Sequence, residues 1–554
     1  MKLGSAIVAF AAFALLLPSA FAKDSAKDRD DKDAANDIKQ APKITYFQPE
    51  ESVSHGSVTV GGNSVDYDAI AGTLVVHPKG WDDAPQTKAE QEETAESESN
   101  SDEKDNKNPS AEASMFYVAY FKHDAKGPRP ITFLYNGGPG SSTVWLHMGA
   151  FGPRRVVTSD DSHTPPAPYA IINNGQSLLD VTDLVFIDAP GTGFSRIAGP
   201  DKEKMFYGVD PDAHAFAEFI NKFLSKYGRW NSPKYLFGES YGTTRSAVLV
   251  NLLEQEYDTD FNGVILLSQI LNFDLSPDGP LDNPGVNIPY QLALPSYAAT
   301  AWYHHKLPGN PPDLEALVSD VEHFAMDDYA HALGEGAALS DAERDAVAEK
   351  LHQYTGLSVA YIKKANLRID GGMFEQNLQG DTDTATGRLD SRFSGPTMDP
   401  LSKETDYDPQ GAAISSAYVS AFNDYVRRDL HFGRDKQFKP EIELWKNWDN
   451  KHVLPGSEEP SQGAANVMPD LAAALKYNPD LKVQLNAGYF DLGTPFFEGQ
   501  YEMRHLDIPA KLQDNIQFRL YKSGHMVYAH QDSLRELHDN VAAFIRETDN
   551  LPAK

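Results

Sequence analysis

The sequence predicts an α/β fold with a mostly parallel central sheet and a helical cap insertion. Short apolar, β-rich segments alternate with helical patterns from residue 130 to about 272. The alternation then pauses in a mainly helical region that extends to about residue 460, and strand patterns return at 481–488 and 516–524. Strands that alternate with helices build parallel sheets, so this order indicates one large domain with an insertion.

The expected strands fall into two groups. At the front of the chain, the segments SVTV, GTLVV and MFYVAYF, with a turn at Gly62 and Asn63, predict an antiparallel hairpin set. The parallel strands are expected at ITFLY (131–135), DLVFID (183–188), KYLFG (234–238) and GVILLS (263–268). The domain built around this sheet would therefore comprise residues 44–272 and 461–554, with the cap at 273–460 between them.

The cap region begins with clustered Pro and Gly in SPDGPLDNPGVNIP. The segment DLEALVSDVEHFAMDDYAHAL then has apolar residues in helical phase. A further helix is expected to begin with a capping box of Ser340 and Glu343 and to end before Gly356. The last helix of the chain is expected from about Asp532 to Glu547.

Residues 1–22 have the pattern of a secretory signal, with a basic Lys2, an apolar stretch and small residues at Ala20 and Ala22. The alternative is an uncleaved anchor, although the apolar run is short for a membrane span. Residues 23–43 are charged and predict a disordered leader. Residues 82–113 predict an acidic, solvated insertion, because ten acidic and three basic residues lie between Asp82 and Lys107.

Composition limits the classes of function. The 554 residues carry a net charge of −31, which argues against nucleic acid as a partner. The chain has no cysteine, so its stability must come from its core rather than from disulfides. It also has no acceptor sequence for N-glycosylation. With the signal, these features predict a bacterial exported protein, periplasmic or extracellular, without a membrane span after signal removal; the oligomeric state is left open.

Ser240 is the strongest candidate for a nucleophile. It stands in the sequence GESYG, after an expected strand and before the helix-like SAVLVNLLEQEY. A G-x-S-x-G sequence in that context matches a nucleophile elbow, in which a sharp turn exposes the serine. Side chains at positions 238 and 242 would clash with the strand and the helix, which accounts for the two glycines.

A serine needs a base, and the base needs an orienting acid. Asp491 follows one late strand and His525 follows the next, so the chain order Ser, Asp, His fits an α/β-hydrolase fold. His530 is the local rival for the base, and Asp507 and Asp514 are rivals for the acid. These rivals lie closer to helical or loop segments.

The glycine-rich stretch YNGGPGSS (135–142) supplies a third part of the expected site. Glycines let backbone N–H groups approach a ligand closely, as an oxyanion hole requires. An ordinary Gly-Pro turn is the alternative. We expect neither a cofactor nor a metal for this chemistry.

Taken together, these stretches resemble the serine carboxypeptidases. The matching stretches, NGGPGSS, DAPGTGFS, FGESYG, AGYFD and SGHMV, occur in the order of that family over residues 115–548. The resemblance implies a triad of Ser240, Asp491 and His525 and an oxyanion hole of the Gly138 and Tyr241 N–H groups. It also implies that Asn136, Gly137 and Glu239 bind the terminal carboxylate of a peptide substrate, with Glu239 protonated and donating.

The sequence also departs from the pattern of that family. Leu134 stands where a Trp is usual, Ala150 where a second Glu is usual, and Ser141 where a Cys is common, and DAPGTGFS is one residue short. We therefore expect a serine-type hydrolase that removes C-terminal residues from peptides. An esterase or acyltransferase with the same triad is the first alternative. A non-catalytic binding protein on a hydrolase scaffold is the second.

Overall fold

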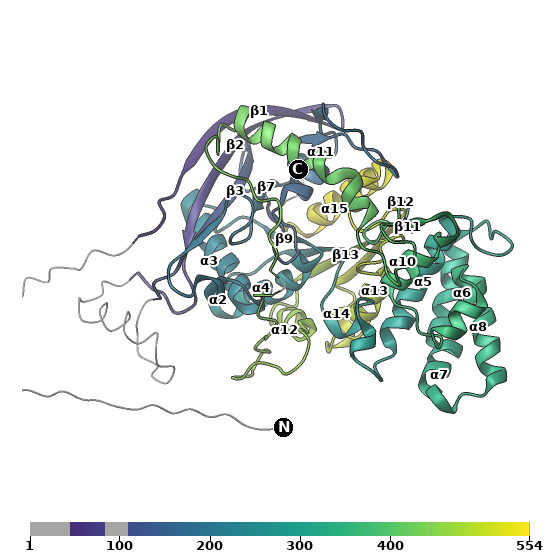
Figure 1. The fold of residues 1–554 in the computed structure, drawn as a ribbon. Helices are drawn as coiled ribbons and strands as arrows, with labels where there is room; N and C mark the ends of the chain where they lie inside the picture. Colours follow the sequence, from purple (N-terminus) through teal and green to yellow (C-terminus); the bar gives the residue numbers. More distant parts are fainter. Residues whose placement is uncertain (1–44, 84–108, 445, 553–554) are drawn as a thin grey trace, which may run out of the picture.

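A computed structural model describes residues 45–83, 109–444 and 446–552 and contains one large mixed sheet (Figure 1). Along its main path the strand order is β1-β2-β3-β7-β4-β9-β10-β13-β14, with β8 paired to β3. The strands are β1 (Glu51–Val60), β2 (Asn63–Val76), β3 (Glu112–Lys122), β4 (Ile131–Tyr135), β7 (Asp183–Ile187), β8 (Arg196–Ala198), β9 (Lys234–Glu239), β10 (Gly263–Leu267), β13 (Lys482–Gly488) and β14 (Ile516–Tyr521).

The direction of the strands confirms the predicted mostly parallel sheet. From β7 through β4, β9, β10 and β13 to β14, every neighbouring pair is parallel. At the front of the sheet β2 is antiparallel to both β1 and β3, as predicted, and β3 is antiparallel to β7. Two small ribbons lie outside this sheet: β5 (Arg154–Val156) pairs with β6 (Ile171–Asn173), and β11 (Thr384–Thr386) pairs with β12 (Ser394–Pro396).

Two apolar cores cover the sheet. One core includes side chains from α3, α4 and α12, and the other includes side chains from α11 and α15. The parallel strands contribute alternate residues to both cores, because successive side chains of a strand point to opposite faces. The helices that contribute to the two cores are α2 (Lys202–Phe206), α3 (Val209–Tyr227), α4 (Tyr241–Tyr257), α11 (Pro409–Arg428), α12 (Met468–Tyr477) and α15 (Gln531–Thr548).

A third apolar core lies among the helices at one end of the molecule (Figure 1). It is built mainly from α5 (Ile288–Tyr303), α6 (Leu314–Met326), α7 (Asp328–Glu335), α8 (Asp341–Thr355), α9 (Val359–Lys364) and α10 (Gly371–Asn377). The capping box of Ser340 and Glu343 is confirmed. The single helix expected over DLEALVSDVEHFAMDDYAHAL is wrong, because the backbone leaves helical geometry at Asp327 and begins again as α7.

Helix α11 packs differently from the other helices between residues 273 and 460. Its buried side chains, including Tyr418 and Phe422, belong to the core that α11 and α15 form against the central sheet. They do not belong to the core of α5–α10. The expected cap segment therefore contains a helix that is part of the main body. This matters for the site, since α11 brings Tyr418 close to it.

The expected acidic insertion at 82–113 extends too far. Glu112 and Ala113 belong to β3 and pair with Ala198 and Ile197 of β8, so strand pairing has already begun at those positions. The central part of the tract, the expected signal at 1–22 and the expected leader at 23–43 lie outside the described residues. Within the described ranges, none of the helices combines the length and apolarity that a bilayer span requires.

Helix α13 (Phe496–Arg504) carries two buried carboxyl groups, Glu498 and Glu502. Glu502 accepts hydrogen bonds from Gln269 Nε2 at 2.6 Å and from the Asn272 N–H at 2.7 Å. Neither carboxyl oxygen of Glu498 has a partner among the described residues. Burial raises the pKa of both groups, and Glu502 further raises the pKa of Glu498. The folded protein therefore favours a protonated Glu498.

We expect the melting temperature to fall between pH 5 and pH 8, and Glu498→Gln to reduce that fall. A carboxyl group whose pKa is raised on folding contributes to the stability of the folded protein. The contribution is complete below the pKa of the unfolded state and is lost as the pH rises through the pKa of the folded state. A tenfold change in an acid dissociation constant on folding corresponds to about 1.4 kcal/mol. Calorimetry over this pH range measures the effect, with Glu349→Gln on exposed α8 as the control. An unchanged pH dependence in Glu498→Gln would contradict the prediction.

Candidate active site

Ser240 lies on the predicted turn between a strand and a helix. Strand β9 ends at Glu239 and α4 begins at Tyr241, which confirms the expected context. Ser240 has φ 60° and ψ −131°, a conformation that side-chain-bearing residues rarely adopt. Its N–H donates to the Leu267 carbonyl oxygen at 3.0 Å, so the next strand, β10, holds the turn in place.

The two glycines around Ser240 are required by close backbone approach. A Cβ atom at Gly238 would lie 2.1 Å from the Gly242 carbonyl oxygen. A Cβ atom at Gly242 would lie 2.9 Å from the Tyr135 carbonyl oxygen. Side chains at these positions would therefore force β9, α4 and β4 apart, as expected from the sequence.

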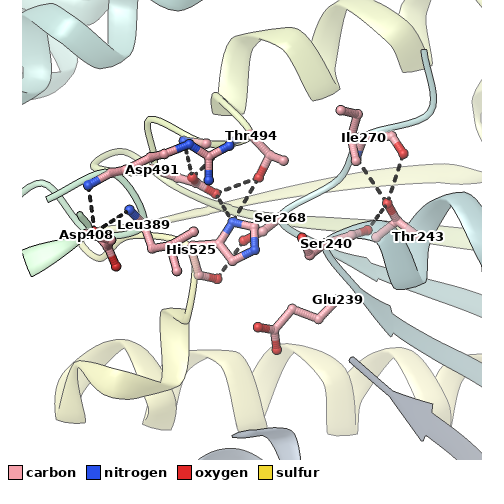
Figure 2. A network of polar contacts seen from close by, with 12 residues as sticks. Glu239, Ser240, Thr243, Ser268, Ile270, Leu389, Asp408, Asp491, Thr494 and His525 are labelled. Atoms are coloured by element: carbon pink, nitrogen blue, oxygen red, sulfur yellow. Dashed lines mark hydrogen bonds and ion pairs between the residues drawn. The ribbon is translucent and has the colours of Figure 1, made fainter. Parts of the chain in front are cut away.

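Asp491 and His525 come together at the ends of the neighbouring strands β13 and β14 (Figure 2). His525 Nδ1 lies 2.8 Å from Asp491 Oδ2. Asp491 is fully buried and also accepts hydrogen bonds from the Gly493 N–H, the Thr494 N–H and the Thr494 hydroxyl at 2.9, 3.0 and 2.7 Å. These donors stabilise an ionised carboxylate and fix its direction.

The backbone of His525 is held on both sides. Its N–H donates to the Leu389 carbonyl oxygen at 2.6 Å, and its carbonyl oxygen accepts from the Ser268 hydroxyl at 2.6 Å. Ser268 directly follows Leu267, the residue that binds the Ser240 N–H. One end of β10 therefore ties the segment of His525 to the turn of Ser240, and Figure 2 shows the imidazole between Asp491 and Ser240 in the view drawn.

The surroundings of His525 suit an imidazole that accepts a proton. Because the carboxylate of Asp491 can only accept, Nδ1 carries the proton that it donates, which leaves Nε2 with a lone pair in the neutral ring. Burial alone would lower the pKa of His525, but Asp491 and Glu239 outweigh it and the pKa is raised. A proton taken up by this ring is thus stabilised by the two carboxyl groups.

Glu239 is buried next to Ser240, with 3% of its surface exposed. Its carboxyl oxygens accept from the Tyr528 hydroxyl at 2.8 and 3.1 Å. Burial raises its pKa to about 7, although His525, Tyr528 and Asn136 act in the opposite direction. Glu239 can therefore be protonated near neutral pH and act as a hydrogen-bond donor.

The glycine-rich loop after β4 contacts the first turn of α4. A Cβ atom at Gly137 would lie 2.4 Å from the Tyr241 nitrogen, and Gly138 has a φ of 106°. Among the hydrogen bonds of the described residues, neither the Gly138 N–H nor the Tyr241 N–H has an acceptor within the chain. Asn136 is buried beside them, and its Oδ1 accepts from the Leu146 N–H at 3.1 Å.

The structure shows the surroundings of the three residues that differ from the family pattern. Leu134 is buried in the core, and Ala150 is buried in a turn of π-helix at Leu146–Phe151. Ser141 accepts from the Trp145 indole N–H at 2.8 Å. Next to Ala150, a Cβ atom at Gly149 would lie 2.6 Å from the Tyr418 hydroxyl and 2.7 Å from a ring carbon of Tyr528. Tyr418 and Tyr528 therefore lie close to the residue that precedes Ala150, the position where the family usually has a second Glu.

The rival residues have other partners. His530 Nδ1 lies 2.8 Å from the Ser533 hydroxyl at the start of α15. Asp507 pairs with Lys476 at 3.1 Å on the surface, and Asp514 follows the short helix α14 (Ala510–Gln513). The sequence analysis missed Tyr528 and Tyr418. Tyr528 is only three residues after His525, but a tyrosine in an apolar run carries no signal of its role.

Comparisons with known proteins point to one family. The family model described as serine carboxypeptidase matches residues 103–273, a range that contains Asn136 and Ser240. A serine carboxypeptidase family member from Dictyostelium discoideum is 30% identical over 24% of this chain and 30% of its own length. Serine carboxypeptidase-like 31 from Arabidopsis thaliana is 23% identical over 72% of each chain. The chain spans 30% and 24% of the lengths of the first two curated relatives.

A solved structure supports the fold. The Saccharomyces cerevisiae prohormone-processing carboxypeptidase Kex1 has a TM-score of 0.50 and 16% identity to this chain, over 87% of this chain and 92% of its own. Together with the sheet order, this confirms the predicted α/β-hydrolase fold. The family match confirms the predicted resemblance to the serine carboxypeptidases.

We expect Ser240→Gly to have a larger free energy of unfolding than Ser240→Ala. Glycine adopts positive φ without a steric penalty, whereas alanine keeps the Cβ atom, and relief of such strain is worth roughly 1 kcal/mol. The Ser240 side chain makes no capping hydrogen bond to α4. Loss of the hydroxyl therefore costs both variants the same small amount of stability. Denaturant unfolding of the two variants measures the difference. Equal stabilities would argue against strain at this turn.

Proposed function

We propose that the protein is a serine-type carboxypeptidase that releases C-terminal residues from peptides through an acyl-enzyme. The observation that carries this proposal is the buried pair of Asp491 and His525 next to the strained turn of Ser240, with Glu239 beside the nucleophile. The resemblance to serine carboxypeptidases supports the same conclusion. The N-terminal sequence pattern supports export of the chain.

In the proposed reaction, His525 Nε2 takes the proton of the Ser240 hydroxyl while the oxygen attacks the carbonyl carbon of the last peptide bond. The carbonyl oxygen becomes an oxyanion, which the Gly138 and Tyr241 N–H groups stabilise. The protonated His525 gives its proton to the departing amine as the C–N bond breaks. Water, deprotonated by His525, then attacks the acyl-enzyme and releases the shortened peptide with the free Ser240 hydroxyl.

Recognition of the substrate terminus would depend on Glu239, Asn136 and Gly137. A protonated Glu239 donates a hydrogen bond to a carboxylate, whereas an ionised one repels it. The neutral form is available because burial raises the pKa of Glu239 to about 7. A bound substrate carboxylate would raise this pKa further, since like charges disfavour ionisation.

An esterase or acyltransferase with the same three residues is the second candidate, and the loss of a second carboxyl at Ala150 favours it. The two candidates differ on one peptide offered as the free acid and as its C-terminal amide. A carboxypeptidase prefers the acid, whereas a general esterase or acyltransferase gains nothing from the terminal charge. A non-catalytic binding protein would turn over neither form.

We expect kcat/KM on the peptide acid to fall as the pH rises above about 7, and Glu239→Gln to flatten this fall. Above its pKa, each pH unit lowers the protonated fraction of Glu239 about tenfold. The amide of Glu239→Gln donates at every pH. Protonated His525 limits the rate at low pH in both enzymes. The measurement is a pH profile for the acid and the amide forms of one N-blocked dipeptide. Identical profiles for both enzymes and both substrates would contradict the assignment of Glu239.

We expect His525→Ala to lose nearly as much activity as Ser240→Ala, roughly 10⁴-fold or more, and the double variant to lose little more. Members of a triad act as one unit, so their losses are not additive. His530→Ala is the matched control, since its imidazole binds Ser533 instead, and should retain most activity. Losses that multiply in the double variant would show that His525 acts apart from Ser240.

A further inference from the structure

Arg155 on β5 is a half-buried cation without a carboxylate partner among the described residues. Its Nη2 donates to the Gln531 side-chain oxygen at 2.6 Å, and its Nε is buried with no acceptor in the described chain. Burial lowers the pKa of Arg155, and the only opposing group is the Tyr418 hydroxyl. In a chain with 80 acidic and 49 basic residues, an arginine without an acidic neighbour is unusual.

Arg155 lies on the side of the site where Glu239 is bound. Its partner Gln531 is three residues after Tyr528, whose hydroxyl donates to Glu239. Tyr418 lies near both residues, because Arg155 lowers and Glu239 raises the pKa of its hydroxyl. Tyr418 and Tyr528 both contact the backbone of Gly149, as the short distances from a Cβ atom built there indicate.

A half-buried guanidinium with one donor that lacks an acceptor has a definite chemical preference. Burial of a charge is costly unless the charge is paired and hydrogen-bonded. A guanidinium offers parallel N–H donors that match the two oxygens of a carboxylate. The Nε donor of Arg155 has no acceptor among the described residues, which favours a carboxylate supplied by a ligand.

We propose that Arg155, together with the Tyr418 hydroxyl, binds a carboxylate on the last residue of the peptide substrate. This inference rests on the proposed function and deepens it. The carboxylate is either the terminal one or that of an acidic side chain, and both have the same chemistry. Arg155 would take over the part of the missing carboxyl at Ala150, with one difference: an arginine keeps its charge at every working pH, whereas a carboxyl donates only when protonated.

The test is direct binding in the Ser240→Ala background, where no turnover occurs. Calorimetry compares three ligands: N-acetyl-Ala-Ala, its C-terminal amide, and N-acetyl-Ala-Asp amide, whose only carboxylate is on the side chain. Arg155→Gln removes the charge and Arg155→Lys keeps it. Arg154→Gln, one residue earlier on the same strand, is the matched control, because adjacent strand residues point to opposite faces.

We expect Arg155→Gln to weaken binding of one carboxylate ligand roughly 10- to 100-fold, the range for loss of a charge-assisted hydrogen bond. A loss on N-acetyl-Ala-Ala identifies the terminal carboxylate, and a loss on N-acetyl-Ala-Asp amide identifies a side chain. Arg155→Lys should recover part of the affinity, and binding of N-acetyl-Ala-Ala amide should not change. Unchanged binding of both carboxylate ligands, an equal loss on the uncharged amide, or an equal loss in Arg154→Gln would overturn the inference.

The same ligands separate this inference from the proposed function. If the protein with Ser240 intact hydrolyses no peptide acid but Arg155-dependent binding is measured, the proposed function fails and the carboxylate site stands. If the peptide acid is hydrolysed and Arg155→Gln binds it normally, only the inference fails. If neither carboxylate ligand binds to the Ser240→Ala protein, the inference is also overturned.

Discussion

The close approach of β4, β9 and α4 around Ser240 is the constraint on which the rest of the site depends. The backbone of Ser240 is held at positive φ by the bond of its N–H to β10, and glycines at 137, 238 and 242 leave the room that this requires. The same approach brings the Gly138 loop against the first turn of α4 and sets Glu239 below the turn. A larger side chain at any of these glycines would therefore disturb several proposed functions together.

Two carboxyl groups near the turn have opposite surroundings. Asp491 accepts hydrogen bonds from two backbone N–H groups, a hydroxyl and the imidazole of His525, all of which favour its charged form. Glu239 has the neutral hydroxyl of Tyr528 as its partner, and burial raises its pKa to about 7.

Much of the fold follows from the sequence because it depends on local patterns. The alternation of strands and helices predicts the parallel sheet, and the glycines around Ser240 predict the turn. The features that the sequence did not predict depend on tertiary contacts. Nothing in DLEALVSDVEHFAMDDYAHAL marks the break at Asp327, and the apolar face of α11 does not reveal that it packs under the sheet. Tyr528, Tyr418 and Arg155 likewise gain their interest only from neighbours distant in sequence.

The central claim is that Ser240 is the one activated nucleophile of the protein. The most direct measurement is intact and peptide mass spectrometry after reaction with a serine-directed organophosphorus reagent. The account predicts one adduct per chain, located on the peptide that contains Ser240, with no adduct in denatured protein or in Ser240→Ala. An adduct on another residue, or full labelling of Ser240→Ala, would contradict it.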